Sequence, residues 1–78
     1  MPTLLRWNGF RFYFFSNEGS EPPHIHVDKA EFSAKFWLNP VRLAENHGFP
    51  YNEIIKLEKK IIENQTEFEN AWNEYFRS

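Results

Sequence analysis

The sequence predicts an α+β domain, in which a small antiparallel sheet of three or four N-terminal strands packs against C-terminal α-helices. Two observations support this prediction. In the first half of the chain apolar residues alternate with polar ones, which is the period of a half-buried strand. Beyond residue 50 they recur at every third or fourth position, which is the period of a helix. We expect a single domain over residues 1–78, with strands at about 3–38 and helices at about 51–77.

The first two strands are predicted around a tight turn between Leu4 and Phe15. Asn8-Gly9 is the strongest short hairpin signal, because a two-residue turn of this kind needs positive φ at both positions. The strand after it has two faces, which hold Phe10, Phe12 and Phe14 on one side and Arg11, Tyr13 and Phe15 on the other. Residues 16–23 are polar and contain Gly and Pro, so they predict a loop.

Two further strands are predicted at His24 to Asp28 and Phe32 to Leu38. The second places Ser33, Lys35 and Trp37 opposite its apolar residues. The next segment has two interpretations. Pro40 at a first helical position and Gly48 just past the end predict a short helix through Asn46. The alternative is a turn into another strand over Val41 to Ala44.

The C-terminal part predicts two helices that are bent or broken near Asn64. A helical apolar stripe runs through Ile54, Leu57, Ile61 and Ile62, and a second one through Phe68, Ala71, Trp72, Tyr75 and Phe76. Between the stripes, Thr66 followed three residues later by Glu69 has the form of a capping box, so the second helix is expected to begin there. The helices are predicted to cover one face of the sheet, with Glu63, Glu67, Glu69 and Glu74 in solvent.

The composition restricts the class of protein. Nine Phe, three Tyr and three Trp enlarge the core that a chain of 78 residues can form. The chain has no Cys, so disulfides and thiolate chemistry are excluded, and a reducing compartment fits. No apolar run approaches the roughly 18 residues of a membrane span, and the first residues lack the apolar region of a signal peptide. We therefore expect a cytoplasmic protein that does not interact with membranes.

The net charge of −2 excludes the global basic field that drives nonspecific nucleic-acid binding. The charges are unevenly distributed, however. Residues 1–50 hold five Lys or Arg and five Asp or Glu, whereas residues 51–78 hold four and six. A surface for nucleic acid would therefore have to be local and lie in the first part of the chain.

The segment from Glu21 to Val27 is the candidate functional centre. Residues two apart on a strand point to the same side, so His24 and His26 are predicted to be an exposed pair, with Ile25 and Val27 facing inward. The rings of Pro22 and Pro23 fix the backbone that enters this strand. Because Pro23 lacks an N–H, a position at the edge or the end of the sheet is expected.

Two adjacent imidazoles permit metal binding, proton transfer near neutral pH, or a plain role on a half-solvated sheet face. Acidic residues lie nearby in the sequence at Glu18, Glu21, Asp28 and Glu31. The order Gly19, His24, His26 and Glu31 loosely resembles a cupin metal motif. The chain is too short for a double-sheet jelly roll, and His47 is distant in the sequence. We therefore predict no metal and no other cofactor, although a metal ion that stabilises the fold stays an alternative.

Cations and aromatic residues suggest a substrate surface beside the histidines. If Arg11, Lys35, Tyr13 and Trp37 share their face, the patch suits RNA, since cations bind phosphate and aromatic rings stack on bases. The other interpretation is equally open: Tyr13 and Trp37 belong to a core under a helix, and Lys35 is ordinary surface.

The stretch from Gly9 to Val27 resembles the signature of a bacterial domain-of-unknown-function family, number 4160. The similarity continues through residues 34–38, 43–46, 48–49 and 71–76. One departure is at residues 49–51, where a capping Ser or Thr is expected after Gly-Phe. The pattern of the family falls on Ser16, Asn17, Glu18, Glu21, Pro22, Pro23, His24, His26, Lys35 and Trp37.

The resemblance implies the toxin of a type II toxin–antitoxin module, whose partner is a cognate small antitoxin encoded next to it. We expect a toxin that acts on RNA or translation, as a metal-independent ribonuclease. His24 and His26 would be general acid and base, with Glu18 or Glu21 orienting an imidazole. Substrate would contact Arg11, Lys35, Tyr13, Trp37 and Asn17. The alternative is a non-catalytic protein- or nucleic-acid-binding module, antitoxin-like or regulatory. Association into a homo- or hetero-oligomer is left open.

Overall fold

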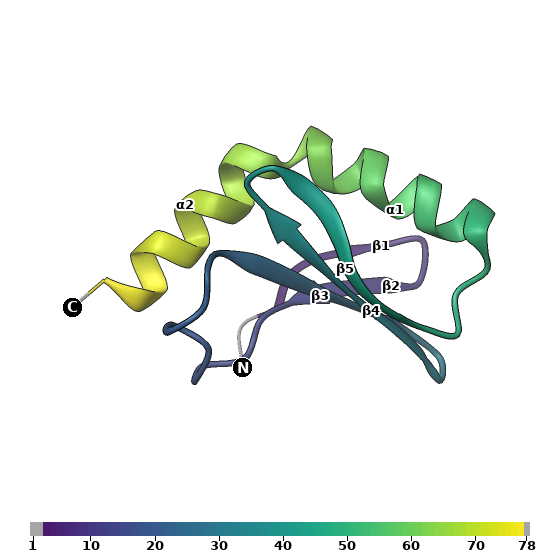
Figure 1. The fold of residues 1–78 in the computed structure, drawn as a ribbon, viewed down its shortest axis with the longest axis horizontal. Coiled ribbons are helices and arrows are strands. Elements are labelled where there is room, and N and C mark those ends of the chain that lie inside the picture. The colour runs from purple at the N-terminus through teal and green to yellow at the C-terminus, as the bar shows by residue number, and fades with distance from the viewer. Residues whose placement is uncertain (1–2, 78) are drawn as a thin grey trace.

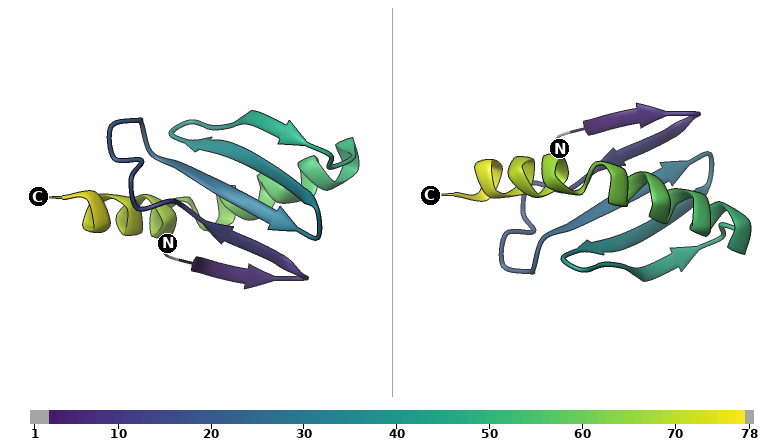
Figure 2. Two further views of the ribbon diagram at one scale, coloured as in Figure 1. Left: turned by 90° about the horizontal axis from the view of Figure 1, so that it is seen from below. Right: turned by 90° about the horizontal axis from the view of Figure 1, so that it is seen from above.

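A computed structural model describes residues 3–77 as one antiparallel sheet with two helices on one of its faces (Figures 1 and 2). The strands lie side by side in chain order: β1 (Thr3–Trp7), β2 (Phe10–Tyr13), β3 (His24–Lys29), β4 (Phe32–Leu38) and β5 (Val41–His47). The helices are α1 (Tyr51–Glu63) and α2 (Gln65–Phe76). The predicted α+β class is confirmed, with an N-terminal antiparallel sheet and C-terminal helices. The sheet has five strands where three or four were predicted.

The turn between β1 and β2 follows from Asn8 and Gly9. Their φ angles are 51° and 83°, so both are positive, as a two-residue hairpin turn requires. Trp7 and Phe10 are consequently paired directly across the two strands. This hairpin sets the register that places the Phe residues of β2 toward the helices.

The prediction of a short helix after Pro40 is wrong, and the alternative of a strand is right. Val41 pairs with Leu38, and Leu43 pairs with Phe36, so β5 completes the hydrogen bonding of β4. A one-residue shift of register between Lys35 and Phe36 accommodates an extra residue in β5. Pairing with a neighbouring strand outweighed the local helix signals, as tertiary contacts often do. Gly48, with a φ of 107°, ends the strand.

The core lies between the sheet and the two helices, on what we call the inner face. Ile25 and Val27 are fully buried there, which confirms that they face inward. Leu57 and Ile61 of α1 pack on the same layer. Among residues 3–77 the buried cluster comprises Phe10, Phe12, Ile25, Val27, Ala34, Phe36, Leu38, Phe49, Ile54, Leu57, Ile61 and Phe68.

The predicted break between the helices is confirmed at Asn64, which ends α1 and precedes α2. Its backbone N–H donates to the carbonyl of Lys60 and its side-chain Nδ2 donates to the same oxygen at 2.9 Å. The second helix begins at Gln65, so the expected start at Thr66 with a capping box is wrong. No helix within residues 3–77 is both long and apolar enough to cross a bilayer.

The helices leave the other side of the sheet uncovered, and we call this side the outer face (Figure 2). The strand registers show which residues share it. His26 pairs with Tyr13 on one side and with Lys35 on the other, and His24 pairs with Trp37. Arg42 lies opposite Trp37 on β5. The registers therefore bring the histidines, Arg11, Lys35, Tyr13 and Trp37 to one face, a point that the sequence left open.

Candidate functional site

The site lies at the end of the sheet where β3 begins, and β3 has two strands on either side of it. β3 is the central strand of five, so the expectation of an edge position is wrong and that of a sheet end is right. Pro23 directly precedes the first paired residue, so its missing N–H costs no ladder hydrogen bond. Its carbonyl accepts the N–H of Leu38 at 3.1 Å. The two prolines therefore fix the entry of the strand without weakening the sheet.

The prediction that the two histidines form an exposed pair is wrong for His24, which has no exposed surface. The cause is α2, which extends past the end of the sheet and lies against this region (Figure 1). Its residue Trp72 packs on the His24 ring with 4.7 Å between ring centroids, and Trp37 lies against it at 5.8 Å. His26 keeps 17% of its side chain exposed. Of the two imidazoles, only that of His26 therefore presents surface to solvent.

The loop between β2 and β3 is held against the same helix. Phe14 is buried among Trp72, Tyr75 and Phe76 of α2. At Gly19 a Cβ atom would lie only 2.6 Å from Cδ1 of Phe76, so no side chain fits without a shift of that ring. This packing fixes the loop segment that carries the acidic residue of the site.

That acidic residue is Glu18, whose carboxylate lies between the two imidazoles. Oε2 is 2.8 Å from Nε2 of His26, and Oε1 is 2.9 Å from Nε2 of His24. The backbone N–H of Phe15 donates to Oε1 at 2.9 Å. Of the two predicted candidates, Glu18 and Glu21, Glu18 is the one that joins both rings.

The protonation of the His24 ring follows from its second nitrogen. Nδ1 lies 3.0 Å from the carbonyl oxygen of Pro22, which can only accept, so Nδ1 carries a hydrogen. Nε2 is fully buried and lies 2.9 Å from Oε1 of Glu18, but it makes no hydrogen bond within residues 3–77. A buried polar atom without an aligned partner is rare in folded proteins.

The pKa of Glu18 is lowered. Burial acts to raise it, but the N–H of Phe15 and the rings of His26 and His24 together outweigh that effect. Glu18 is therefore ionised at neutral pH, and only 15% of its side chain is exposed. A fixed carboxylate next to two imidazoles permits either proton transfer through His26 or the binding of a cation.

Tyr13 lies beside His26 but offers little surface to a ligand. It is 6% exposed, stacks on the His26 ring at 5.4 Å and is covered by the guanidinium of Arg11 at 4.3 Å. Its hydroxyl donates to Oδ2 of Asp28 at 2.9 Å. Burial and this acceptor raise the pKa of Tyr13 to about 12. We therefore assign Tyr13 to the support of His26 and not to stacking on a base.

Lys35 and Glu21 form an ion pair at the rim of the site, with 2.7 Å between Nζ and Oε1. The hydrogen bond to Lys35 lowers the pKa of Glu21. Glu21 is 3.8 Å from Nδ1 of His24, too far for a hydrogen bond, so it does not orient that ring. Lys35 also lies over the ring of Trp37 at 4.6 Å. Asn17 is exposed on the loop.

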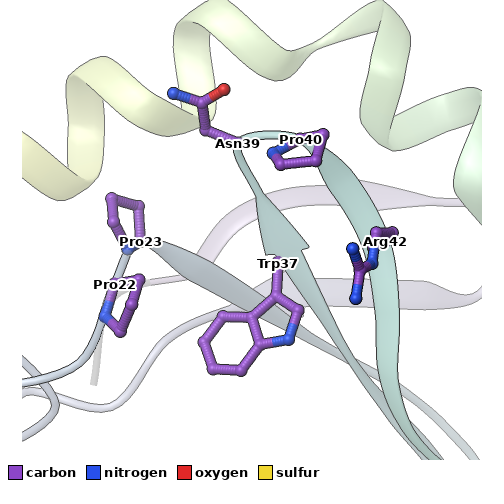
Figure 3. A pocket seen from close by; sticks show the side chains of 6 residues that line it. All are labelled: Pro22, Pro23, Trp37, Asn39, Pro40 and Arg42. Atoms are coloured by element: carbon purple, nitrogen blue, oxygen red, sulfur yellow. The ribbon is translucent and has the colours of Figure 1, made fainter.

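A cavity of about 220 Å³ adjoins the site on the outer face (Figure 3). The indole of Trp37 lies between Pro22 on one side and Arg42 on the next strand. The cavity lining comprises Pro22, Pro23, Trp37, Asn39, Pro40 and Arg42. Arg42 was absent from the predicted site residues. It would have been found if Val41–His47 had been interpreted as a strand, because Arg42 then falls opposite Trp37.

The donor atoms of Glu18, His24 and His26 lie within 4.8 Å of one another, so these three residues could hold a metal ion. The residues that were weighed with them in the cupin-like pattern lie elsewhere. Glu31 is exposed in the turn after β3, and His47 contacts Glu45 at 3.2 Å on β5.

Comparison with known proteins gives one match. The model of a family described as "Domain of unknown function (DUF4160)" matches residues 9–73. That range contains both histidines, Glu18 and every residue of the cavity. No curated protein and no solved structure matches the chain.

Proposed function

The chain belongs to the DUF4160 family, and from this premise we propose that it binds single-stranded RNA on the outer face of its sheet. We further propose that it is the toxin of a toxin–antitoxin module, neutralised by a small protein encoded beside it. The observation that supports RNA binding is that Trp37 and Arg42 lie together in an open cavity. This cavity adjoins the cluster formed by Glu18, His24 and His26. The toxin role rests on the implication of the family resemblance.

An uncovered antiparallel sheet with aromatic and cationic side chains suits single-stranded RNA. Unpaired bases stack on aromatic rings, and the backbone phosphates pair with Lys and Arg. Trp37 and Arg42 lie next to each other across β4 and β5, so one base and its phosphate could be bound together. Within residues 3–77, Arg42 forms no ion pair, so its charge is available to a ligand.

The distribution of charge favours the outer face over the helices. Residues 51–78, which include both helices, hold six acidic and four basic residues. The remaining part of the chain holds five of each. RNA on the outer face is therefore separated from the acidic excess by the sheet, which reduces repulsion.

The position of Glu18, His24 and His26 suggests that bound RNA also undergoes a chemical reaction at this site. The His24 ring contacts Trp37, and His26 is the partly exposed member of the cluster. A nucleotide stacked on Trp37 would place its sugar and phosphate near Lys35 and His26, which are paired across β3 and β4. His24 is buried and takes part only through Glu18.

The test measures binding of a fluorescent single-stranded RNA by anisotropy at several salt concentrations. Trp37→Ala should weaken binding about fivefold to hundredfold, as loss of one stacked base does. Arg42→Ala should lower affinity and reduce the salt dependence by about 0.7 per lost phosphate contact. Lys59→Ala is the matched control, because it removes the same charge from an exposed position on α1 and should change little.

Equal effects of Arg42→Ala and Lys59→Ala would contradict binding at the outer face. If the chain binds no RNA but forms a stable complex with another protein, the non-catalytic interaction module replaces this proposal. For the toxin role, expression in a bacterial host should arrest growth, and co-expression of the neighbouring gene should relieve the arrest. His26→Ala should abolish the arrest, whereas His47→Ala should leave it intact. No arrest by the unaltered chain would refute the toxin role.

A further inference from the structure

We infer that Glu18, His24 and His26 form a binding site for one divalent transition-metal ion of the Zn²⁺ class. This site goes beyond the proposed function, because metal binding needs neither RNA nor a partner. Three independent observations support it: the unpartnered nitrogen of His24, the hydrogen bond that fixes its tautomer, and the geometry of the donor atoms.

The first observation is the buried Nε2 of His24. This nitrogen has no exposed surface and no hydrogen-bond partner within residues 3–77, although it lies among polar atoms. Leaving such a group unsatisfied destabilises the folded chain. A metal ion accepts the lone pair of a neutral imidazole and would remove this destabilising effect.

The second observation is the hydrogen bond at the other nitrogen. Nδ1–H of His24 donates to the carbonyl of Pro22 at 3.0 Å, which leaves the lone pair on Nε2, the atom that lies 2.9 Å from Oε1 of Glu18. Histidines that bind metals almost always donate their second N–H to a carbonyl or carboxylate in this way. The rigid Pro22-Pro23 segment holds the accepting carbonyl in place.

The third observation is the arrangement of the donor atoms. Both imidazoles present Nε2 to the same carboxylate, at 2.8 and 2.9 Å, and all three donor groups lie within 4.8 Å. Metal–ligand bonds of about 2.0–2.2 Å in a tetrahedral site separate the donors by roughly 3.3–3.6 Å. An ion could therefore be accommodated if the cluster widens by about half an ångström.

The donor set also restricts which ion binds. Two imidazole nitrogens and one carboxylate suit Zn²⁺, Co²⁺, Ni²⁺ and Fe²⁺, whereas Mg²⁺ and Ca²⁺ prefer oxygen donors throughout. Because His26 and Glu18 remain partly exposed, a fourth position of the ion would face solvent on the outer face. Three protein ligands with one open position is the pattern of catalytic zinc sites.

The test is calorimetric titration of EDTA-treated, extensively dialysed protein with ZnCl₂, supported by the visible absorption of the Co²⁺ form. We expect one ion per chain and a rise in melting temperature with Zn²⁺. His26→Ala and Glu18→Gln should each weaken binding at least about tenfold and abolish the thermal shift. His47→Ala is the matched control, since that histidine is exposed and outside the cluster, and it should bind like the parent.

His24→Ala is left out of the decisive set, because loss of a fully buried ring could unfold the chain. Absence of binding at a one-to-one ratio, or equal Zn²⁺ affinity in His26→Ala, Glu18→Gln and the parent, would overturn the inference. The metal titration contains no RNA, and Arg42→Ala should bind Zn²⁺ normally. Failure of the metal site and failure of RNA binding are therefore separate results.

Discussion

The two faces of one sheet differ sharply in what their side chains do. On β4, Phe36 points to the inner face and is fully buried, whereas its neighbour Trp37 points to the outer face and lines an open cavity. The inner face is apolar and its central residues are covered by the helices, so its side chains determine stability. The outer face carries charged and aromatic residues whose polar groups are only partly satisfied. Along the same strand, alternate residues therefore either pack in the core and stabilise the fold or point outward and can contact a ligand.

The outer face contains buried polar atoms that lack hydrogen-bond partners within the described part of the chain, which destabilises the fold. Besides Nε2 of His24, Oδ1 of Asp28 is buried without a hydrogen-bond partner within residues 3–77. Asp28 uses its other oxygen to accept from Tyr13. Unsatisfied buried groups are rare in folded proteins, and each calls for an explanation such as a bound ion or a catalytic role. Both atoms belong to β3, the strand that carries the candidate site.

The largest expected effect comes from Phe36→Ala on the inner face. Removing this fully buried ring should lower the free energy of unfolding by about 3–5 kcal/mol, because a cavity is left in the core. That is a large share of the total for a domain of this size, which is roughly 4–12 kcal/mol. Urea titration followed by circular dichroism measures it.

Phe36→Leu serves as a milder variant if Phe36→Ala does not fold. It should keep the fold with a smaller loss, because most of the apolar volume remains. The claim that the inner face determines stability would be refuted if Phe36→Ala destabilised the chain no more than an outer-face variant such as Arg42→Ala.

A smaller effect is expected at Tyr13, which lies on the outer face but is buried. Burial and the hydrogen bond to Asp28 raise its pKa from the ordinary 10.0 to about 12, so the folded state holds this proton more tightly. Stability from this group is present below pH 10 and is lost as the pH rises toward 12. Urea titrations across this range should show the loss in the parent and a weaker loss in Tyr13→Phe.

At neutral pH, Tyr13→Phe should cost about 1–2 kcal/mol, because Asp28 loses the only hydrogen bond its side chain makes within the described chain. Tyr51→Phe is the control, since this residue is 79% exposed and should change stability by less than about 0.5 kcal/mol. Identical alkaline curves for the parent and Tyr13→Phe would show that Tyr13 is not the group responsible.

The elements that were predicted correctly are those with a clear local signal. Asn8-Gly9 predicted the hairpin, and the spacing of Leu57 and Ile61 predicted the first helix. Both signals depend only on residues that are close together in the sequence. β5 was missed because its strand character depends on pairing with β4. Local rules favoured a helix at Pro40, and they contain no information about which strand lies alongside.

The site shows the same limit. The strand period placed His24 and His26 on one side, which is correct, but their different exposure depends on Trp72, which lies far along the chain. The choice between Glu18 and Glu21 also depends on how the loop packs on α2. Sequence reasoning therefore found the segment and its residue types, whereas the arrangement came from contacts between distant parts.

The smallest effect on stability is expected from Glu21→Gln at the rim of the outer face. Glu21 is well exposed, so its ion pair with Lys35 is screened by salt and contributes little to folding. RNA affinity should nevertheless rise, because Lys35 loses its internal counter-ion and becomes free to bind phosphate. Anisotropy titrations at low salt measure this gain, which we expect to be a fewfold decrease in Kd.

Glu63→Gln is the matched control for Glu21→Gln. It removes the same charge from α1, where Glu63 lies 3.6 Å from Lys60, and it changes the net charge equally. If both variants raised RNA affinity alike, net charge alone would explain the gain, and the outer face would have no special role. A gain confined to Glu21→Gln, with unfolding midpoints equal in all three proteins, would show that this face can be tuned for binding without affecting the fold.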